Sequence, residues 1–263
     1  MEAWNACGES YTWESLRGRE CYAGLDLSKT KDMTSLVLVF PFEESGKTIF
    51  RSWPFFWLPE ERIEALSLSY PFKRWVNEGH LIPTKDKRVG FVELKHAIRK
   101  IAKHVEIQDL LYDPWKAEEL TQELVEGEHD LDTGRVLFEP IGAKRTAVGQ
   151  GMGQFSEPTM AFEHHMLGQD IRHPMNPVLT WQASHIEVYS DGNNNIKPVK
   201  PKGQEYTGKS IDGIVAFIMG LAGAVRAERS QPRIWKACLH RNLRKHGYGH
   251  VCVDCGEKIA KRA

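Results

Sequence analysis

Short apolar segments of strand length recur along the chain, and segments with helical periodicity separate them. The predicted strands are 21–27, 34–42, 48–57, 107–113 and 136–138, with a hairpin of 184–190 and 195–199 around an Asp-Gly-Asn-Asn-Asn turn. Apolar spacing and proline positions predict helices at 60–69, 71–77, 93–106, 116–126, 156–168 and 210–225. A meander of three strands followed by alternating strands and helices predicts an α/β mixed sheet flanked by helices.

The pattern also divides the chain into three parts. Residues 1–20 read as a polar lead-in segment with Trp4 and Trp13 as candidate packing anchors. Residues 21–226 carry the predicted sheet and helices. Residues 227–263 are polar and basic and contain the last three cysteines, which predicts a small separate module.

Composition places the protein among soluble globular proteins, with 41% hydrophobic and 27% charged residues. No apolar run approaches the ~20 residues that a membrane-spanning helix needs, and the first residues do not resemble a signal peptide. Five cysteines, two of them in a Cys-x-x-Cys pair, favour metal binding or free thiols over a disulfide framework. We therefore expect a reducing compartment, the cytoplasm.

The net charge of zero hides an asymmetry between the two ends of the chain. Residues 194–263 contain 14 Lys or Arg and 5 Asp or Glu, whereas residues 1–193 contain 21 and 30. The basic end could attract a polyanion or could simply be a solvated tail. The acidic part would repel a polyanion unless cations intervene.

Four acids stand out because they lie beside or inside apolar segments: Asp26, Asp32, Asp113 and Asp212. A buried carboxylate is unfavourable unless something compensates its charge, and Asp26 lies inside the first predicted strand. An edge-strand aspartate facing water would explain one such acid, and an acid in the first turn of a helix, such as Asp212, can simply complement the helix dipole. If the acids meet in the fold, however, they cannot all stay ionised without cations.

Two Mg²⁺ or Mn²⁺ ions would neutralise such a cluster, because hard cations prefer oxygen ligands. A pair of ions about 3.5–4 Å apart supports in-line attack of water on a phosphodiester. If the four acids meet, they could therefore hold two cations that support hydrolysis of a phosphodiester.

Five blocks, in order along the chain, resemble the C-terminal nuclease domain of tailed-bacteriophage large terminases. They are Gly-Leu-Asp-Leu-Ser-x-Thr-x-Asp-Met-Thr at 24–34, Leu-Tyr-Asp-Pro-Trp at 111–115, Asn-Pro-Val-Leu-x-Trp at 176–181, Asn-Ile-Lys-Pro at 195–198 and Ile-Asp-Gly-Ile-Val-Ala at 211–216. The resemblance runs from about residue 4 to residue 225. It implies a ribonuclease H-like fold and a metal-dependent endonuclease that cuts concatemeric double-stranded viral DNA in the host cytoplasm. Its implied metal ligands are Asp26, Asp32, Asp113 and Asp212, with Asp26, Asp113 and Asp212 catalytic.

A complete large terminase also carries an ATPase motor ahead of the nuclease, and no part of this sequence corresponds to that motor. Residues 203–210 formally match the P-loop pattern, but a P-loop needs a buried strand leading into its glycines. The preceding segment, 196–202, contains two prolines and three lysines instead. We expect no ATPase activity, and the resemblance implies that the ATPase part, the small terminase subunit and the portal are partners.

The same basic segment suggests DNA contacts through Lys200, Lys202 and Lys209, which could meet phosphates beside the acids. A merely solvated loop is the alternative. No role is assigned to His164, His165 or His185, because isolated histidines on helices and strands seldom act as ligands or bases.

The terminal module contains a Cys-x-x-Cys-Gly step and a Cys-x-His pair, which predict a zinc site formed by Cys238, His240, Cys252 and Cys255. His246 or His250 could replace His240. So short a segment would depend on the metal for most of its folding energy. The alternative is a tail with incidental cysteines.

Two other functions are compatible with parts of this pattern. One is a catalytically inactive, prophage-derived module that binds DNA or partners through its basic end; retention of all four acids argues against it. The other is a different ribonuclease H-like enzyme, such as a junction resolvase, and the blocks outside the acids argue against that.

Overall fold

A computed structural model of the protein describes residues 1–28, 32–85, 89–130, 132–201 and 209–230, together with the backbone of three short strands at 243–246, 249–252 and 258–259. The chain divides into two compact units, Met1–Arg226 and Ala227–Ala263. No helix of the described residues has the length and apolar character that a membrane span requires.

The first unit is built on a mixed sheet with the strand order β4-β3-β2-β1-β5-β8, to which β9 adds beside β3. These strands are β1 (Glu20–Asp26), β2 (Thr34–Glu44), β3 (Lys47–Pro59), β4 (Ile82–Thr84), β5 (Glu106–Tyr112), β8 (Lys144–Ala147) and β9 (Ile171–Arg172). Strands β1 to β3 form an antiparallel meander, and β1, β5 and β8 run parallel. The predicted α/β mixed sheet is confirmed.

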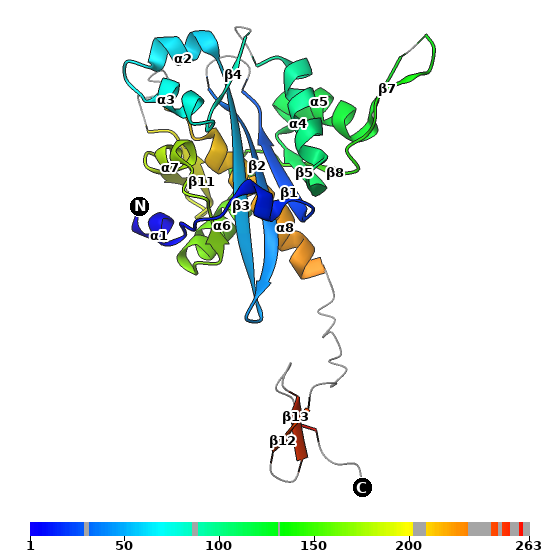
Figure 1. Ribbon diagram of the computed structural model, residues 1–263. Coiled ribbons are helices and arrows are strands. Elements are labelled where there is room, and N and C mark those ends of the chain that lie inside the picture. Colours follow the sequence, from blue (N-terminus) through cyan, green and yellow to red (C-terminus); the bar gives the residue numbers. More distant parts are fainter. Residues whose placement is uncertain are drawn as a thin grey trace. The chain divides into compact units, whose positions relative to one another are not determined.

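Helices cover both faces of this sheet (Figure 1). They are α1 (Glu2–Ala6), η1 (Trp13–Leu16), α2 (Glu60–Leu66), α3 (Phe72–Asn77), α4 (Phe91–Ala102), α5 (Pro114–Glu126), α6 (Met152–Leu167), α7 (Pro177–Ala183) and α8 (Asp212–Ser230). Two short hairpins complete the unit, β6 (Glu128–His129) with β7 (Val136–Phe138), and β10 (Glu187–Ser190) with β11 (Ile196–Val199).

Side-chain alternation along β1 assigns the two faces of the sheet. Cys21, Ala23 and Leu25 lie in the apolar cluster that includes the buried faces of α4 and α5. The residues between them face α8 instead, because successive side chains of a strand point to opposite sides. Asp26 therefore shares a face with Gly24 and points to the side that α8 covers.

The contact between α8 and β1 is a backbone contact. A Cβ on Gly24 would lie 1.9 Å from the carbonyl oxygen of Ala216, and one on Gly223 would lie 3.4 Å from the Cβ of Tyr22. The helix therefore runs antiparallel to the strand, and glycines allow the two backbones to approach more closely than side chains would permit. Figure 1 shows α8, in orange, crossing the blue strands.

Most predicted elements are present, and the deviations have local causes. The helix expected at 116–126 begins at Pro114, because Asp113 caps it and proline suits the first helical position. The predicted strand 184–190 starts at Glu187, after α7, which we did not predict although Asn176 and Pro177 form a standard helix start. The predicted lead-in segment contributes Trp4 and Leu16 to the buried interior.

The second unit contains β12 (Leu243–His246), β13 (Gly249–Cys252) and β14 (Lys258–Ile259), paired as an antiparallel sheet. Of the predicted zinc ligands, Cys238, His240 and Cys255 lie outside the described residues. Cys252 is the last residue of β13, for which only the backbone pairing is described.

Candidate active site

Two neighbouring parallel strands bring Asp26 and Asp113 together. Leu25 of β1 pairs with Tyr112 of β5, so the acids that follow these residues lie side by side at the carboxyl ends of the strands. Asp26 is 3% exposed and Asp113 is 5% exposed. One carboxylate oxygen of Asp113 accepts a hydrogen bond of 3.1 Å from the backbone N–H of Trp115, which caps α5 and orients the side chain.

Helix α8 brings Asp212 to the same end of the sheet. Gly24 of β1 contacts Ala216 of α8, and the two elements run antiparallel. Two residues of a strand and four residues of a helix each span about 6–7 Å. Asp26, two residues after Gly24, and Asp212, four residues before Ala216, therefore lie at the same height. Asp212 is buried in the first turn of α8, and the hydroxyl of Ser210 donates a short hydrogen bond to its carboxylate.

Asp32 reaches the cluster from the connection between β1 and β2. Its backbone N–H donates to the hydroxyl of Ser28 at 3.1 Å. Its carboxylate forms an ion pair of 2.7 Å with the ammonium of Lys200, which follows β11. Lys200 therefore lies among the acids, and its predicted contact with DNA phosphate remains a prediction.

Lys116, in the first turn of α5, is the cation that connects all four acids. Its Nζ lies 3.7 Å from Oδ1 of Asp26. Burial acts to lower the pKa of Lys116, but the charges of the four carboxylates, led by Asp26, raise it above its usual value. Each of the four acids thus lies close enough to interact electrostatically with one ammonium group.

Two of the four buried or partly buried acids, Asp26 and Asp212, resist ionisation. Burial raises the pKa of Asp26, and Asp113 and Asp32 add to the rise, whereas Lys116 and a hydrogen bond of 3.4 Å from Gln150 oppose it.

Burial raises the pKa of Asp212 to about 7, with the charges of Asp26 and Asp32 acting in the same direction. Lys200 and the Ser210 hydroxyl counteract this rise. Two ammonium groups therefore only partly neutralise four carboxylates that have been brought together.

The chemistry of this donor set fits hard divalent cations. Carboxylate oxygens are the ligands that Mg²⁺ and Mn²⁺ prefer. Burial, together with the charges of neighbouring carboxylates, raises the pKa of Asp26 and Asp212, and a bound cation would offset both effects. Among the described residues, no three His, Cys, Asp or Glu side chains already stand in metal-binding geometry. Metal binding would therefore require these side chains to rearrange.

Several residues of the site carried no recognisable sequence signal. Lys116 and Gln150 contact Asp26, yet nothing in their local sequence marks them, and Ser210, which bonds to Asp212, was noted only as the last residue of the P-loop match. His185, which was assigned no role, donates from Nε2 to the carbonyl oxygen of Ser210 at 2.7 Å. The sequence block that begins at Asn176 supported the family resemblance but did not predict a structural role. In the structure Asn176 caps the start of α7, and Gln182 of this helix bonds to Gly213, next to Asp212.

The remaining predicted DNA contacts lie in the segment before α8. Lys209 is close enough to His185 for its charge to lower the pKa of that histidine, after the larger effect of burial. Lys202 lies outside the described residues. Strand β11, which leads into this segment, pairs with β10 in a separate hairpin, so the P-loop match lacks the central strand that such a loop requires.

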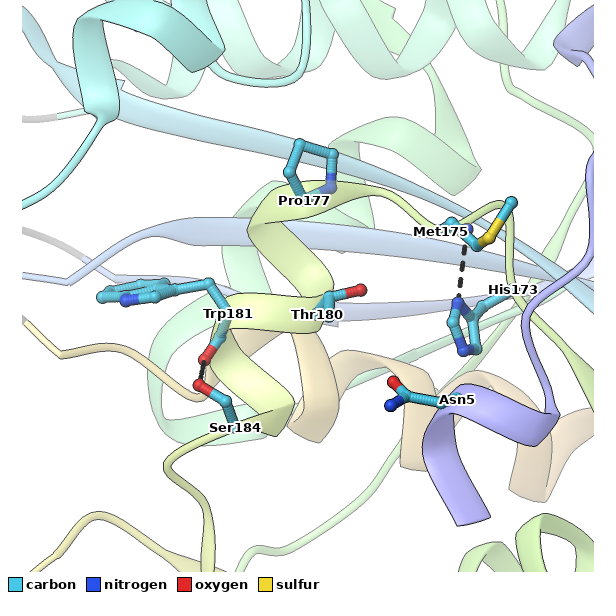
Figure 2. A pocket seen from close by; sticks show the side chains of 7 residues that line it. All are labelled: Asn5, His173, Met175, Pro177, Thr180, Trp181 and Ser184. Atoms are coloured by element: carbon cyan, nitrogen blue, oxygen red, sulfur yellow. Dashed lines mark hydrogen bonds between the residues drawn. The ribbon is translucent and has the colours of Figure 1, made fainter. Parts of the chain in front are cut away.

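A pocket of about 610 Å³ lies elsewhere, between α1 and α7. Figure 2 shows the side chains that line it: Asn5, His173, Met175, Pro177, Thr180, Trp181 and Ser184. Three of its polar side chains have partners within the protein: both ring nitrogens of His173 are hydrogen-bonded, Thr180 accepts from Trp4, and Ser184 donates to the carbonyl of Trp181. None of the four acids lines this pocket.

Comparison with known proteins identifies similar chains. The sequence profile of the family described as "Terminase large subunit, endonuclease domain" matches residues 2–228. The large terminase subunit of enterobacteria phage HK97 is 31% identical over 225 residues, which cover 84% of this chain and 40% of that protein. The protein YmfN of Escherichia coli strain K12 is 24% identical over 239 residues, covering 87% and 49%.

The same similarity is present in three dimensions. The crystal structure of the HK97 bacteriophage large terminase matches with a TM-score of 0.68 and 28% identity, covering 84% of this chain and 42% of that chain. The chain thus spans less than half the length of each of these relatives.

Proposed function

The chain belongs to the endonuclease-domain family of terminase large subunits, and we propose that it cuts double-stranded DNA by metal-dependent hydrolysis at Asp26, Asp32, Asp113 and Asp212. The observation that carries the proposal is the meeting of four carboxylates from β1, the β1–β2 connection, β5 and α8 around the ammonium of Lys116. A cluster of this charge has little purpose in a purely structural domain, because it opposes folding.

In the proposed mechanism the four carboxylates would hold two Mg²⁺ or Mn²⁺ ions. When bound, such ions supply Lewis-acid activation of water and stabilise charge on the phosphate. Asp26 is oriented by Gln150, and Asp212 is oriented by Ser210. Lys116 and Lys200 supply positive charge at the same place, which favours the approach of a phosphodiester backbone.

The strand order supports the ribonuclease H-like assignment. Three antiparallel strands are followed by two that run parallel to the first, and Asp26 and Asp113 lie at the ends of the central pair, β1 and β5. The retention and clustering of all four acids favour a nuclease over the non-catalytic DNA-binding module.

The wider role is part of the same proposal. We infer that the substrate is concatemeric DNA in the host cytoplasm. The ATPase part, the small terminase subunit and the portal are the proposed partners. The basic residues 227–263 are proposed to add affinity for DNA or for an acidic partner, with zinc bound at Cys238, His240, Cys252 and Cys255.

Cleavage of supercoiled plasmid tests the proposal. Purified protein with Mn²⁺ or Mg²⁺ is expected to nick and linearise the plasmid, and EDTA is expected to abolish the reaction. Asp26→Asn should lower the rate by orders of magnitude, because it removes a ligand charge while keeping the side-chain shape. Unchanged cleavage by Asp26→Asn would assign the chemistry to another site, and ATP should have no effect.

A further inference from the structure

A single buried amide links the segments that carry Asp32 and Asp212. Gln182, near the end of α7, has no exposed surface. Its Oε1 accepts a hydrogen bond of 2.6 Å from the backbone N–H of Gly213, and its Nε2 lies 3.4 Å from the sulfur of Met33. Gly213 directly follows Asp212, and Met33 directly follows Asp32.

The chemistry of the contacts fixes the orientation of this side chain. A backbone N–H can only donate, so the amide oxygen must face Gly213, and the amide nitrogen is left toward the weak acceptor of Met33. Burying a glutamine is unfavourable unless its polar atoms are paired. An apolar residue would fill the same volume without that penalty, so the hydrogen bond to α8 is the distinctive contribution of Gln182.

That hydrogen bond acts at the start of α8, where backbone N–H groups lack partners within the helix. Gln182 satisfies Gly213, and His185 holds the carbonyl of Ser210, whose hydroxyl in turn bonds to the Asp212 carboxylate. The segment is therefore held on both sides of Asp212, by Gln182 of α7 and by His185, which follows that helix. The backbone at Gly213 also packs closely on Phe56, since a Cβ at this position would lie 2.6 Å from the ring of Phe56.

We propose that Gln182 is a positioning residue that fixes Asp212 relative to Asp32 for divalent-cation binding. The proposal rests on the proposed function, since it takes both acids as metal ligands. A site whose ligands come from separate segments needs such support to hold its geometry. It also gives the motif at 176–181 a purpose: Asn176 caps α7 and thereby sets the position of Gln182 along the helix.

Calorimetric titration with Mn²⁺ tests the role without measuring catalysis. Gln182→Met keeps the side-chain volume and removes the acceptor, so it should weaken Mn²⁺ binding by about 10–100-fold, the range seen when a ligand-orienting residue is lost. Thr159→Val is the matched control, because Thr159 is also buried and its hydroxyl bonds only to a helix carbonyl in α6. Thr159→Val should lower the melting temperature by about as much as Gln182→Met but should leave the dissociation constant for Mn²⁺ unchanged.

An unchanged Mn²⁺ affinity in Gln182→Met, or an equal loss in Thr159→Val, would overturn the proposal. Should Gln182→Met fail to fold, Gln182→Glu retains an oxygen opposite the Gly213 N–H. Mn²⁺ binding within about threefold of the wild type, or tighter, would then support the role, and a loss greater than tenfold would contradict it. If the wild type itself bound no Mn²⁺ and cut no DNA, the proposed function would fail instead, so the two failures are distinguishable.

Discussion

Gly24 of β1 and Ala216 of α8 approach so closely that no side chain fits between them: a Cβ on Gly24 would meet the carbonyl oxygen of Ala216 at 1.9 Å. This backbone contact sets the height of α8 over the sheet. Asp26 lies two residues after Gly24 along β1, and Asp212 lies four residues before Ala216 along α8. The contact between Gly24 and Ala216 therefore also sets the separation of the two acids.

Gly24→Ala is therefore expected to displace α8 and to disturb the acid cluster together with the fold. Overpacking of this kind destabilises proteins by about 1–3 kcal/mol, and denaturant unfolding should show a loss at the upper end of that range or beyond. Mn²⁺ affinity should fall as well. Gly192→Ala, where a Cβ meets no atom within 4 Å, is the control and should change neither quantity. Wild-type stability in Gly24→Ala would show that α8 does not rest on β1 at this point.

The raised pKa of Asp212 predicts a pH-dependent penalty in metal-free protein. The folded state keeps this proton up to about pH 7, whereas the unfolded chain loses it near pH 4. Ionisation of Asp212 thus costs stability progressively as the pH rises through that window, and the full cost applies above pH 7. In EDTA, Asp212→Asn should stabilise the protein by about 2–4 kcal/mol at pH 8 and by much less at pH 5.

Asp130→Asn provides a control of opposite sign. Hydrogen bonds from Thr133 and neighbouring N–H groups lower the pKa of Asp130, so its contribution is favourable above the unfolded pKa and is lost as the pH falls. Its replacement should therefore not stabilise the protein at pH 8. Parallel stability curves for wild type and Asp212→Asn between pH 5 and pH 8 would contradict the account of Asp212.

Lys116 is expected to act as the resident counter-ion of the acids. Lys116→Met should lower the stability of metal-free protein by about 1 kcal/mol at pH 8, a modest value because 41% of the side chain is exposed. Mn²⁺ should then raise the melting temperature of the variant more than that of the wild type, since the cation replaces the lost charge. Lys73→Met removes an exposed ion pair with Glu64 and should leave the response to Mn²⁺ unchanged. An equal response in all three proteins would remove Lys116 from the cluster.

Much of this site could be anticipated from the sequence, because an acid at the end of an apolar strand is visible in one dimension. Asp26 and Asp113 have that signature, and adjacent parallel strands then bring them together. Lys116 has no such signature: a lysine in the first turn of a helix normally faces solvent, and only the pairing of β1 with β5 places it beside Asp26.

Some strands and helices likewise could not be predicted from their local sequence. Strand β8, Lys-Arg-Thr-Ala, has no apolar pattern of its own and exists because β5 offers it an edge. Helix α7 is short, and its importance lies in Gln182, whose partners Met33 and Gly213 come from distant parts of the chain. Contacts between remote segments decide such features, and local sequence does not encode them.

The terminal module is predicted to bind one zinc ion through Cys238, His240, Cys252 and Cys255. Elemental analysis of purified protein should find one zinc per chain, and Cys252 and Cys255 should resist alkylation until a chelator is added. Removing residues 230–263 should leave metal-dependent cleavage intact and weaken DNA binding at moderate salt, because phosphate contacts by lysine and arginine are salt-sensitive. Absence of zinc together with free alkylation of both cysteines would retire the prediction.

The most direct test of the central claim is anomalous diffraction from crystals of the wild-type protein soaked in Mn²⁺. We predict two anomalous peaks among Asp26, Asp32, Asp113 and Asp212, with carboxylate oxygens at about 2.0–2.6 Å from the ions and the ammonium of Lys116 displaced from Asp26. Crystals of Asp212→Asn should show the peaks weakened or lost. A cleavage-competent protein whose Mn²⁺ peaks lie away from these acids, or are absent from them at saturating Mn²⁺, would contradict the assignment of this cluster as the nuclease site.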